Sequence, residues 1–292
     1  MSVSCPFSSV EYLQGLSNIG VVDIHPYLPF SVLRRTIPGT RYQDGVGPWP
    51  YRWISHESDI EVFREGFRHL VTLCVVTHPG WEPSASLAEK VNIRPLKAHY
   101  GYNPEMPAPA LSKRARKRLA VAERNGRFEM ISSTQEQLVI VEAYEELVKR
   151  RQLTDGFFDM PKSHMASIAR IKGSLFFRVN NAQGLGAIAC GVIIGEFLQM
   201  LHIIPTEYGL TWNAAYLMMF GLQNYVRRHN LTLLTGGMPA GGSAGLQIFK
   251  QRWTNTSYPV NMLCICNDPV TAGMLTEKLG YNADYFPNYR HG

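Results

Sequence analysis

The segment 245–253 reads Gly245-Leu246-Gln247-Ile248-Phe249-Lys250-Gln251-Arg252-Trp253. Its apolar residues Leu246, Phe249 and Trp253 recur at helical spacing, which predicts a helix with one apolar face. Lys250 and Arg252 leave that helix at other angles. Packing by the apolar face would carry the lysine into a cleft, but a surface helix with two solvated charges has the same periodicity. The surrounding sequence is needed to separate these two interpretations.

Size and composition indicate a folded protein. The chain has 292 residues, which favours two domains over one large domain. Hydrophobic residues make up 45% and charged residues 18%, a balance typical of folded soluble proteins. Residues 1–9 lack the pattern of an export signal, and the apolar run 187–194 is far too short to cross a membrane. We therefore expect a cytoplasmic protein without membrane association.

The cysteines do not form a metal-binding pattern. The chain has five, and only Cys264 and Cys266 are close together. Alternation along a predicted strand puts this pair on one face, but no second pair of ligands accompanies it. Because zinc normally takes four ligands, we interpret the cysteines as reduced core thiols and expect no metal site.

A proline-rich stretch, residues 103–109, separates the two halves of the chain. Repeated prolines fix the φ angle and remove backbone donors, which predicts an extended linker. Before it, residues 54–70 are predicted as a helix with Ser58 as a possible cap, and residues 70–77 as a strand. Residues 41–51 form a predicted aromatic turn, which is either a rigid surface turn or a substrate-contacting loop.

The first helix after the linker has clear boundaries. Ser112 is its predicted N-cap, Gly126 follows its end near Asn125, and its narrow apolar stripe consists of Ala115, Leu119 and Ala122. A capping-box pattern at Thr134 and Gln137 predicts the start of the next helix. The packing face of that helix is predicted at Leu138, Val141 and Val148.

The remaining elements complete an α/β pattern. Strands are predicted at 174–179, 185–194 and 197–204, with a tight hairpin at 195–196 joining the last two. A long helix at 211–229 follows. Then come a strand at 231–235, the helix at 241–253, a strand at 258–266 and a helix at 269–279.

This order of elements, with Gly245-Leu-x-x-Phe249-Lys250 in the penultimate helix, resembles the GNAT acyltransferase fold. It resembles in particular the Fem-type branch, which includes aminoacyl-tRNA-dependent peptidoglycan transferases. Proteins of that branch commonly carry two GNAT-like modules, and the segment 97–104 with the basic helix after it resembles their inter-module passage. The resemblance implies an α/β fold of two modules, each a mixed central sheet flanked by helices, with a degenerate first module at 1–108 and a catalytic module at 109–292.

Two departures from the family pattern affect the expected chemistry. Enzymes that use acetyl-coenzyme A usually have Gln/Arg-x-x-Gly-x-Gly/Ala at the start of the long helix, where backbone N–H groups hold the pyrophosphate. Here that place reads Thr206-Glu207-Tyr208-Gly209-Leu210-Thr211-Trp212-Asn213-Ala214, which weakens the case for coenzyme A. Many relatives also have an acidic residue before the glycine turn, where this chain has Thr235-Gly236-Gly237.

The resemblance implies an activity-related role for Lys250, either in stabilising an oxyanion or in binding a donor phosphate. Strand alternation places His202 on a face with Leu198, Met200 and Ile204, where it is a candidate base or a core histidine. Glu207 and Tyr208 are further catalytic candidates, although an exposed loop explains them equally well. Substrate contacts are predicted at Tyr42, Trp49, Trp212, Asn213, Gly236, Gly237 and Phe249.

Positive charge is concentrated after the linker. The formal charge is +6, of which residues 1–112 contribute −1 and residues 113–292 contribute +7. Many of these cations lie in or near the predicted helix after the linker, where they can bind phosphates or form a solvated helix face. Together with the resemblance, they favour tRNA as a binding partner. The predicted tRNA-binding residues are Lys113, Arg114, Arg116, Lys117, Arg118, Arg124, Arg150 and Arg151.

The sequence thus predicts an enzyme that moves an aminoacyl group from aminoacyl-tRNA to an amine of a small molecule or peptide. No serine or cysteine nucleophile motif is present, which suits direct attack of the amine on the ester. Because an ester is exchanged for an amide, no cofactor is expected. The absence of sustained heptads favours a natural-product type of acceptor. The alternatives are an acyl-coenzyme-A-dependent N-acyltransferase and a non-catalytic tRNA-binding module.

Overall fold

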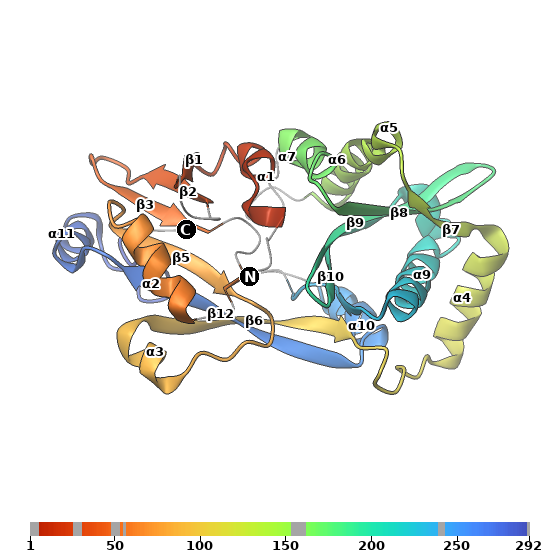
Figure 1. The fold of residues 1–292 in the computed structure, drawn as a ribbon. Helices are drawn as coiled ribbons and strands as arrows, with labels where there is room; N and C mark the ends of the chain where they lie inside the picture. The colour runs from red at the N-terminus through yellow and green to blue at the C-terminus, as the bar shows by residue number, and fades with distance from the viewer. Residues whose placement is uncertain are drawn as a thin grey trace. The chain divides into compact units, whose positions relative to one another are not determined.

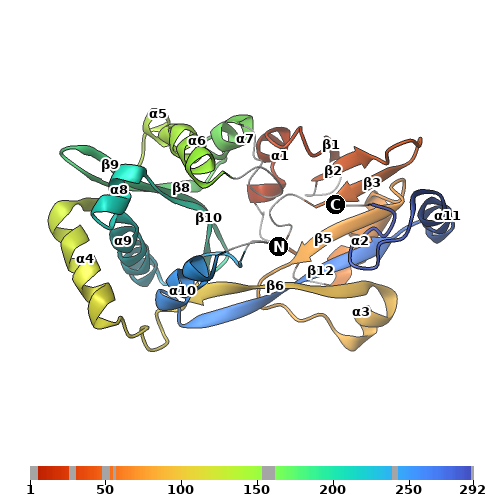
Figure 2. The same cartoon turned by 180° about the vertical axis from the view of Figure 1, so that it is seen from behind.

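A computed structural model of the chain describes residues 6–25, 31–47, 53–54, 57–152, 162–238 and 243–290. It divides into two compact units, which we describe separately. The central unit consists of residues 1–6 and 98–258, and the terminal unit of residues 7–97 and 259–292. The chain is drawn from both sides in Figures 1 and 2. The module boundary that the sequence predicts after residue 108 differs from the divisions between the two units, at residues 97–98 and 258–259. The proline-rich stretch 103–109 lies inside the central unit.

The central unit is built from six strands and seven helices of the described chain. Its strands are the end of β6 (Asn92–Tyr102), β7 (Arg127–Ile131), β8 (Ser174–Asn181), β9 (Gly184–Ile194), β10 (Phe197–Pro205) and β11 (Thr232–Leu234), and β12 (Thr256–Cys266) begins in it. Its helices are α4 (Lys113–Asn125), α5 (Thr134–Gln137), α6 (Val139–Arg151), α7 (Lys162–Ile168), α8 (Glu207–Thr211), α9 (Ala214–His229) and α10 (Ala244–Arg252).

The sheet of the central unit has the order β6-β11-β10-β9-β8-β7. Its β10–β11 pair is parallel, and the other pairs are antiparallel. Helices α4 and α9 lie on one face of this sheet, and α6 contacts β9 and β10 from the other, together with α7 (Figure 1). The sheet is therefore covered on both sides, as the apolar strands β9 and β10 require.

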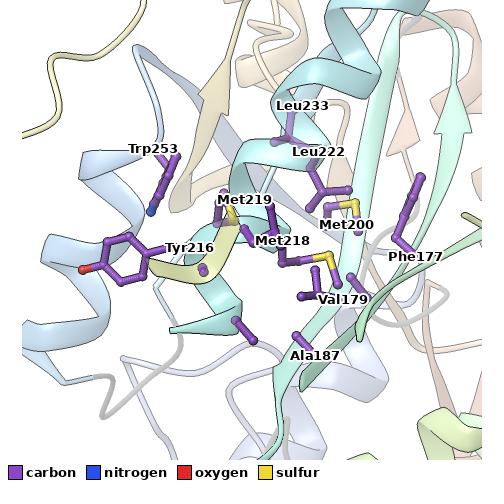
Figure 3. Packing of buried hydrophobic residues seen from close by; sticks show 14 of the residues in the cluster. Phe177, Val179, Ala187, Met200, Tyr216, Met218, Met219, Leu222, Leu233 and Trp253 are labelled. Carbon is purple, nitrogen blue, oxygen red and sulfur yellow. The ribbon is translucent and has the colours of Figure 1, made fainter. Parts of the chain in front are cut away.

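The core of the central unit forms between the sheet and α9. Alternate residues of the strands, such as Val179, Ala187 and Met200, meet Met218 and Leu222 of the helix (Figure 3). Their side chains are almost completely buried. This packing fixes α9, and with it the helices that lie against its first turn.

The terminal unit contains its own mixed sheet and core. Its strands are β1 (Val21–Ile24), β2 (Ser31–Thr36), β3 (Gln43–Val46), β4 (Trp53–Ile54), β5 (Thr72–Thr77) and the remaining parts of β6 and β12. Its helices are η1 (Pro6–Ser8), α1 (Val10–Gln14), α2 (Glu57–Gly66), α3 (Ala85–Lys90) and α11 (Pro269–Leu279). The strands pair in the order β1-β2-β3-β5-β12, and β4 also pairs with β5. Phe63 and Phe67 of the α2 region pack on Leu73 and Leu263 of the sheet.

Most predicted elements are confirmed. Helix α4 has the predicted bounds, and the Ser112 hydroxyl accepts a hydrogen bond from the Ala115 N–H at 3.3 Å. The hairpin between β9 and β10 turns at Gly195, whose φ is 58°. The predicted class is confirmed as well, because each unit has a mixed sheet flanked by helices. Among the described residues, no helix combines the length and apolar character needed to cross a membrane.

Three local predictions are wrong. The capping box is absent, because Ser133 precedes α5 without a side-chain cap and Gln137 donates to the Ile131 carbonyl instead. The buried face of α6 consists of Ile140, Ala143 and Tyr144 rather than the predicted stripe. Ser58 lies inside α2, which begins at Glu57.

The predicted helix 211–229 is confirmed as α9, which begins at Ala214, three residues later than predicted. Two helices, α8 and α9, occupy this region, and Asn213 between them has a φ of 65°. This left-handed conformation cannot continue a right-handed helix, so the chain changes direction there.

Candidate functional site

Strands β10 and β11 diverge in the central unit. They pair only from Phe197 to Gln199 on β10 and from Thr232 to Leu234 on β11. Beyond this point the chain after β11 follows β6, since the Thr235 N–H donates to the Tyr100 carbonyl and the Tyr100 N–H to the Gly236 carbonyl. Strand β10 continues to Pro205 beside β9. The backbone is therefore open between the two strands, as the resemblance to the GNAT fold implies.

Lys250 lies at the end of β11. Its Nζ donates hydrogen bonds to three successive backbone carbonyls, those of Thr235 at 2.6 Å, Gly237 at 2.9 Å and Gly236 at 3.3 Å. The positive φ of Gly236, 73°, turns the backbone so that these carbonyls converge. The structure thus brings together the predicted residues Lys250, Gly236 and Gly237. It holds the ammonium half-buried beside the strand divergence.

The other side of α10 packs on the first turn of α9. The Tyr216 ring meets the rings of Phe249 and Trp253 edge-on, with both centroid distances 5.7 Å. Figure 3 shows the Tyr216 hydroxyl pointing away from the methionine side chains of the core. That hydroxyl accepts hydrogen bonds from Arg252 Nη1 at 2.7 Å and from Arg118 Nη1 at 3.0 Å. We call Arg118, Tyr216 and Arg252 the Tyr216 cluster.

Sequence reasoning missed Tyr216 and Arg252 as site residues. Arg252 is visible only as a cation off the apolar face of its helix, and Tyr216 only as one aromatic residue in an apolar helix. Neither pattern indicates a contact between segments that are 36 residues apart. Gln199 is a further buried polar residue, at the last pair of β10 with β11, and an amide inside an apolar strand is a usable signal in the sequence. It is fully buried, and its Oε1 has no hydrogen-bond partner in the described part of the chain.

His202 does not share a face with Leu198 and Met200. The pairing of β10 with β9 shifts between Met200 and His202, which marks a β-bulge. One extra residue reverses the alternation, so Ile203 packs toward α9 while His202 meets Tyr144 of α6, with ring centroids 5.2 Å apart. Burial lowers the pKa of His202 to about 4. The predicted shared face is therefore wrong, and the geometry favours a core histidine over a base.

Glu207 and Tyr208 lie at the start of α8, apart from the contacts of Lys250. The Tyr208 hydroxyl hydrogen-bonds with Asn181 at 2.8 Å and Gln183 at 2.5 Å, both at the β8–β9 turn. The Glu207 N–H donates to the Glu146 carboxylate at 2.6 Å, and Arg150 pairs with that carboxylate at 2.7 Å. Arg150 is thus neutralised by an acidic partner, which argues against its predicted role in tRNA binding.

The Glu146 contact lies in the segment 206–214, where the resemblance to coenzyme-A-dependent enzymes implies a place for a pyrophosphate. The Thr206 hydroxyl accepts a hydrogen bond from the Gly209 N–H at 3.0 Å. The N–H groups of Glu207 and Gly209 therefore both have side-chain acceptors already. One acceptor, the Glu146 carboxylate, is negatively charged. A pyrophosphate at this position would have to displace it and would be repelled by it.

Trp212 and Asn213 have structural roles in the link between α8 and α9. Trp212 is 7% exposed, and its indole fills the space over Gly126 and Gly186. A Cβ atom on Gly186 would lie 2.2 Å from the indole, so these glycines make room for the ring. Asn213 supplies the left-handed residue at the helix break. Their predicted substrate contacts remain predictions.

The remaining predicted substrate residues belong to the terminal unit. Tyr42 lines an open pocket of about 630 Å³, together with the neighbouring turn residues and Met274, Leu275 and Lys278 of α11. The Arg41 guanidinium lies 5.5 Å from the centroid of the Tyr42 ring. Trp49 lies outside the described residues.

Helix α4 presents the predicted cationic face. It packs on α9 through Ala115, Leu119 and Ala122, which leaves the charged residues on its other sides. Five of the predicted cations are exposed, namely Lys113, Arg114, Arg116, Lys117 and Arg124. Within the described ranges none of these five, nor Arg118, has an acidic group within 4.0 Å. Arg151 is also exposed, at the end of α6.

Solved structures with similar folds were found. FemX aligns with a TM-score of 0.63 at 10% identity, covering 90% of this chain and 93% of FemX. The C-terminal domain (DUF2156) of a putative lysylphosphatidylglycerol synthetase from Agrobacterium fabrum aligns with a TM-score of 0.57 at 10% identity, covering 89% and 87%. L-PGS from Bacillus licheniformis aligns with a TM-score of 0.55 at 11% identity, covering 94% and 98%.

No family model matches this chain, and no curated protein matches its sequence. The assignment therefore rests on the arrangement of elements rather than on sequence similarity. The divergence of β10 and β11 and the helix order agree with the resemblance read from the sequence, and the similar structures cover nearly the whole chain. The chain has the Fem-type GNAT fold.

Proposed function

We propose that this protein transfers an aminoacyl group from aminoacyl-tRNA to an amine of a small molecule or peptide. The observation that carries the proposal is the exposed face of α4, whose cations have no acidic partners in the described chain. Coenzyme A needs only a few cations, whereas an RNA offers a phosphate at every nucleotide. Helix α4 belongs to the same unit as Phe249 and Lys250.

The reaction exchanges an ester for an amide. The acceptor nitrogen bonds to the ester carbonyl carbon, the bond from that carbon to the ribose oxygen breaks, and this oxygen takes up the proton that the nitrogen loses. Holding the two reactants together supplies a large part of the rate, and positive charge stabilises the tetrahedral oxyanion. The Lys250 ammonium can serve as that charge, or it can bind a phosphate of the donor.

Two further observations support aminoacyl-tRNA over coenzyme A. The Glu146 carboxylate accepts a hydrogen bond from the Glu207 N–H in the first turn of α8, where it would oppose a bound pyrophosphate. Similarity to a domain of a putative lysylphosphatidylglycerol synthetase, whose name describes the synthesis of a lysyl conjugate, favours aminoacyl groups over other acyl groups. The longest described helix, α9, has 16 residues, which is short for a coiled-coil insertion and favours a natural-product type of acceptor.

The test is mass spectrometry of the products formed from total charged tRNA and a library of small amines and peptides. The expected product carries the mass of one aminoacyl residue and disappears when the charged tRNA is treated with ribonuclease beforehand. Deacylated tRNA with free amino acids is the control, and it should give no product.

The alternatives predict different results. A coenzyme-A-dependent N-acyltransferase would release free thiol from acyl-coenzyme A and would be insensitive to ribonuclease. A non-catalytic RNA-binding module would bind tRNA but form no product with any charged tRNA. Either result would overturn the proposed transfer.

A further inference from the structure

The Tyr216 cluster brings two guanidinium groups from different helices onto one oxygen atom. Arg118 comes from α4 and Arg252 from α10, and each donates one N–H to the Tyr216 hydroxyl, at 3.0 and 2.7 Å. Their donor nitrogens are therefore separated by no more than the sum of these two distances. Each guanidinium carbon also lies 5.7 Å from the centroid of the Tyr216 ring. Such close approach of two cations requires an explanation.

The charges of the cluster are not balanced by the chain. In the described part of the structure neither Arg118 nor Arg252 has a carboxylate within 4.0 Å. A phenol oxygen is a neutral acceptor, so it orients the two groups without offsetting their repulsion. A guanidinium has five N–H donors, and among the described residues each of these two makes one hydrogen bond, to the Tyr216 hydroxyl. An anion with several acceptor oxygens would satisfy both the charge and the donors.

The cluster is held rigidly. Tyr216 is 6% exposed, and its ring is fixed edge-on between Phe249 and Trp253. The two arginines are half-buried, so they are less screened by water than the cations along the rest of α4. A preorganised pair of guanidinium groups matches the geometry of phosphate oxygens, which favour planar, forked donors.

We propose that the Tyr216 cluster is a phosphate-binding site, in which Arg118 and Arg252 together hold one phosphate group of the acyl donor. This inference rests on the proposed function. Arg118 continues the cationic face of α4, and Arg252 lies two residues after Lys250. A phosphate held here ties the RNA on α4 to the helix that carries Lys250, and so positions the reactive end of the donor.

The test measures binding rather than transfer, with deacylated tRNA and, separately, coenzyme A as phosphate-bearing probes. The variants are Arg118→Gln, Arg252→Gln, the double variant and Tyr216→Phe, each in the full chain with folding checked by circular dichroism. Arg227→Gln is the matched control, because Arg227 also donates to a tyrosine hydroxyl, that of Tyr102 at 2.7 Å, on the far end of α9. Fluorescence anisotropy at several salt concentrations gives the affinity and its salt dependence.

Each single arginine variant is expected to weaken tRNA binding about tenfold and to reduce the salt slope by about 1, while Arg227→Gln changes neither. The double variant should lose less than the product of the two single losses, since both groups hold the same phosphate. Tyr216→Phe should lie between the wild type and the single variants. Wild-type affinity and slope in the double variant, or fully multiplicative losses, would overturn the site.

The two phosphate sources give different results. If the wild type binds coenzyme A but not tRNA, and the arginine variants weaken that binding, the phosphate site stands and aminoacyl-tRNA as donor is refuted. If the wild type binds tRNA and the double variant binds it equally well, the site is refuted and the proposed function is unaffected. Binding of neither probe by the wild type would refute both.

Discussion

Lys250 is held by backbone carbonyls, and this arrangement keeps its positive charge in a fixed place. Three carbonyl dipoles converge on the ammonium from residues 235–237. Fixed charge near a developing oxyanion stabilises the transition state more than mobile charge, because no reorganisation is needed. The same contacts anchor the turn after β11, so the lysine has a structural part in addition to the catalytic one proposed for it.

Substitution of Lys250 separates these two parts. Lys250→Met should lower the rate of aminoacyl transfer by about 10²–10³-fold, the range for loss of one group that stabilises the oxyanion, because the fixed positive charge is removed. Lys250→Arg should keep the charge and restore part of the stability of the turn, but recover little activity because the larger group is misplaced. Transfer rates and thermal unfolding are measured together, with Lys172→Met as an exposed control. Activity of Lys250→Met close to that of the wild type would contradict the role.

The buried histidines His164 and His202 make stability depend on pH. Burial lowers the pKa of His202 to about 4, and burial together with the charge on His202 lowers that of His164 to about 3, both from 6.5. Above pH 6.5 both groups are neutral in the folded and unfolded chain. Below it only the unfolded chain takes up protons, so stability falls as the pH falls toward 4.

Each histidine should lower the folding equilibrium constant about tenfold per pH unit in this window. Urea unfolding midpoints at pH 7.5, 6 and 5 measure the effect. His202→Phe, which retains an aromatic ring beside Tyr144, should remove about half of the pH dependence. His229→Gln is the control, because His229 is exposed. An unchanged pH dependence in His202→Phe would show that other groups cause it.

For single residues, the sequence predicts which residues belong to the site better than it predicts where their side chains point. The Phe249-Lys250 pair is recognisable because it lies in a regular helix after a glycine turn, and the structure brings Lys250 to that turn. The direction of His202 is not predictable from alternation, since one bulged residue reverses it. A bulge depends on pairing with the neighbouring strand, which a local pattern does not contain.

At the scale of the helices, the break between α8 and α9 allows a test of whether Asn213 has a structural role or binds substrate. Asn213 has a φ of 65°, a conformation that glycine adopts without strain and alanine does not. Asn213→Gly should leave stability nearly unchanged, whereas Asn213→Ala should lower it by about 1 kcal/mol. Thermal unfolding and transfer rates of both variants provide the measurement. A large loss of activity in a stable Asn213→Gly variant would instead indicate that the side chain contacts substrate.

Element boundaries were predictable where local chemistry sets them. Helix α4 begins at the Ser112 cap and ends at Gly126, and α11 spans the predicted residues because Asp268 caps it and Pro269 starts it. Helix α5 begins at the predicted Thr134, but the predicted capping box is wrong, since Gln137 bonds to a carbonyl of the preceding strand. The Tyr216 cluster likewise depends on three helices meeting, which no single segment encodes.

At the scale of the whole molecule, the terminal unit is assembled from both ends of the chain. Residues 259–292 belong to it, because β12 pairs with β5 and Arg290 reaches Asp44 across 246 positions of the sequence. A boundary drawn from the proline-rich stretch cannot reveal this, because proline marks where regular structure stops and not which segments pack together. The order of elements predicts two modules, but it does not predict that residues 259–292 pack with the first part of the chain.

The fully buried Asp44 carboxylate allows a test of how the C-terminal segment stabilises the terminal unit. Arg290 donates to both of its oxygens, at 2.5 and 3.2 Å, and also to the Thr36 carbonyl, while Arg35 donates at 2.9 Å. Arg290→Gln leaves a buried charge with one arginine instead of two, which should destabilise the terminal unit by about 2–3 kcal/mol.

Hydrogen exchange of β2 and β3 is the appropriate measurement, since these strands are more than 240 residues from the substitution and hold the other partners of the network. The amides of these strands exchange when the terminal unit unfolds, so a loss of stability raises their opening equilibrium, by about tenfold for each 1.4 kcal/mol. Protection of β2 and β3 should therefore fall about 30-fold or more in Arg290→Gln. Arg94→Gln is the matched control, because the Arg94 side chain also bonds to the C-terminal segment, at the Ala283 carbonyl, but does so at the exposed surface. Equal protection in the two variants would mean that the C-terminal segment packs on the unit without stabilising its first strands, and the buried carboxylate would then be a local feature.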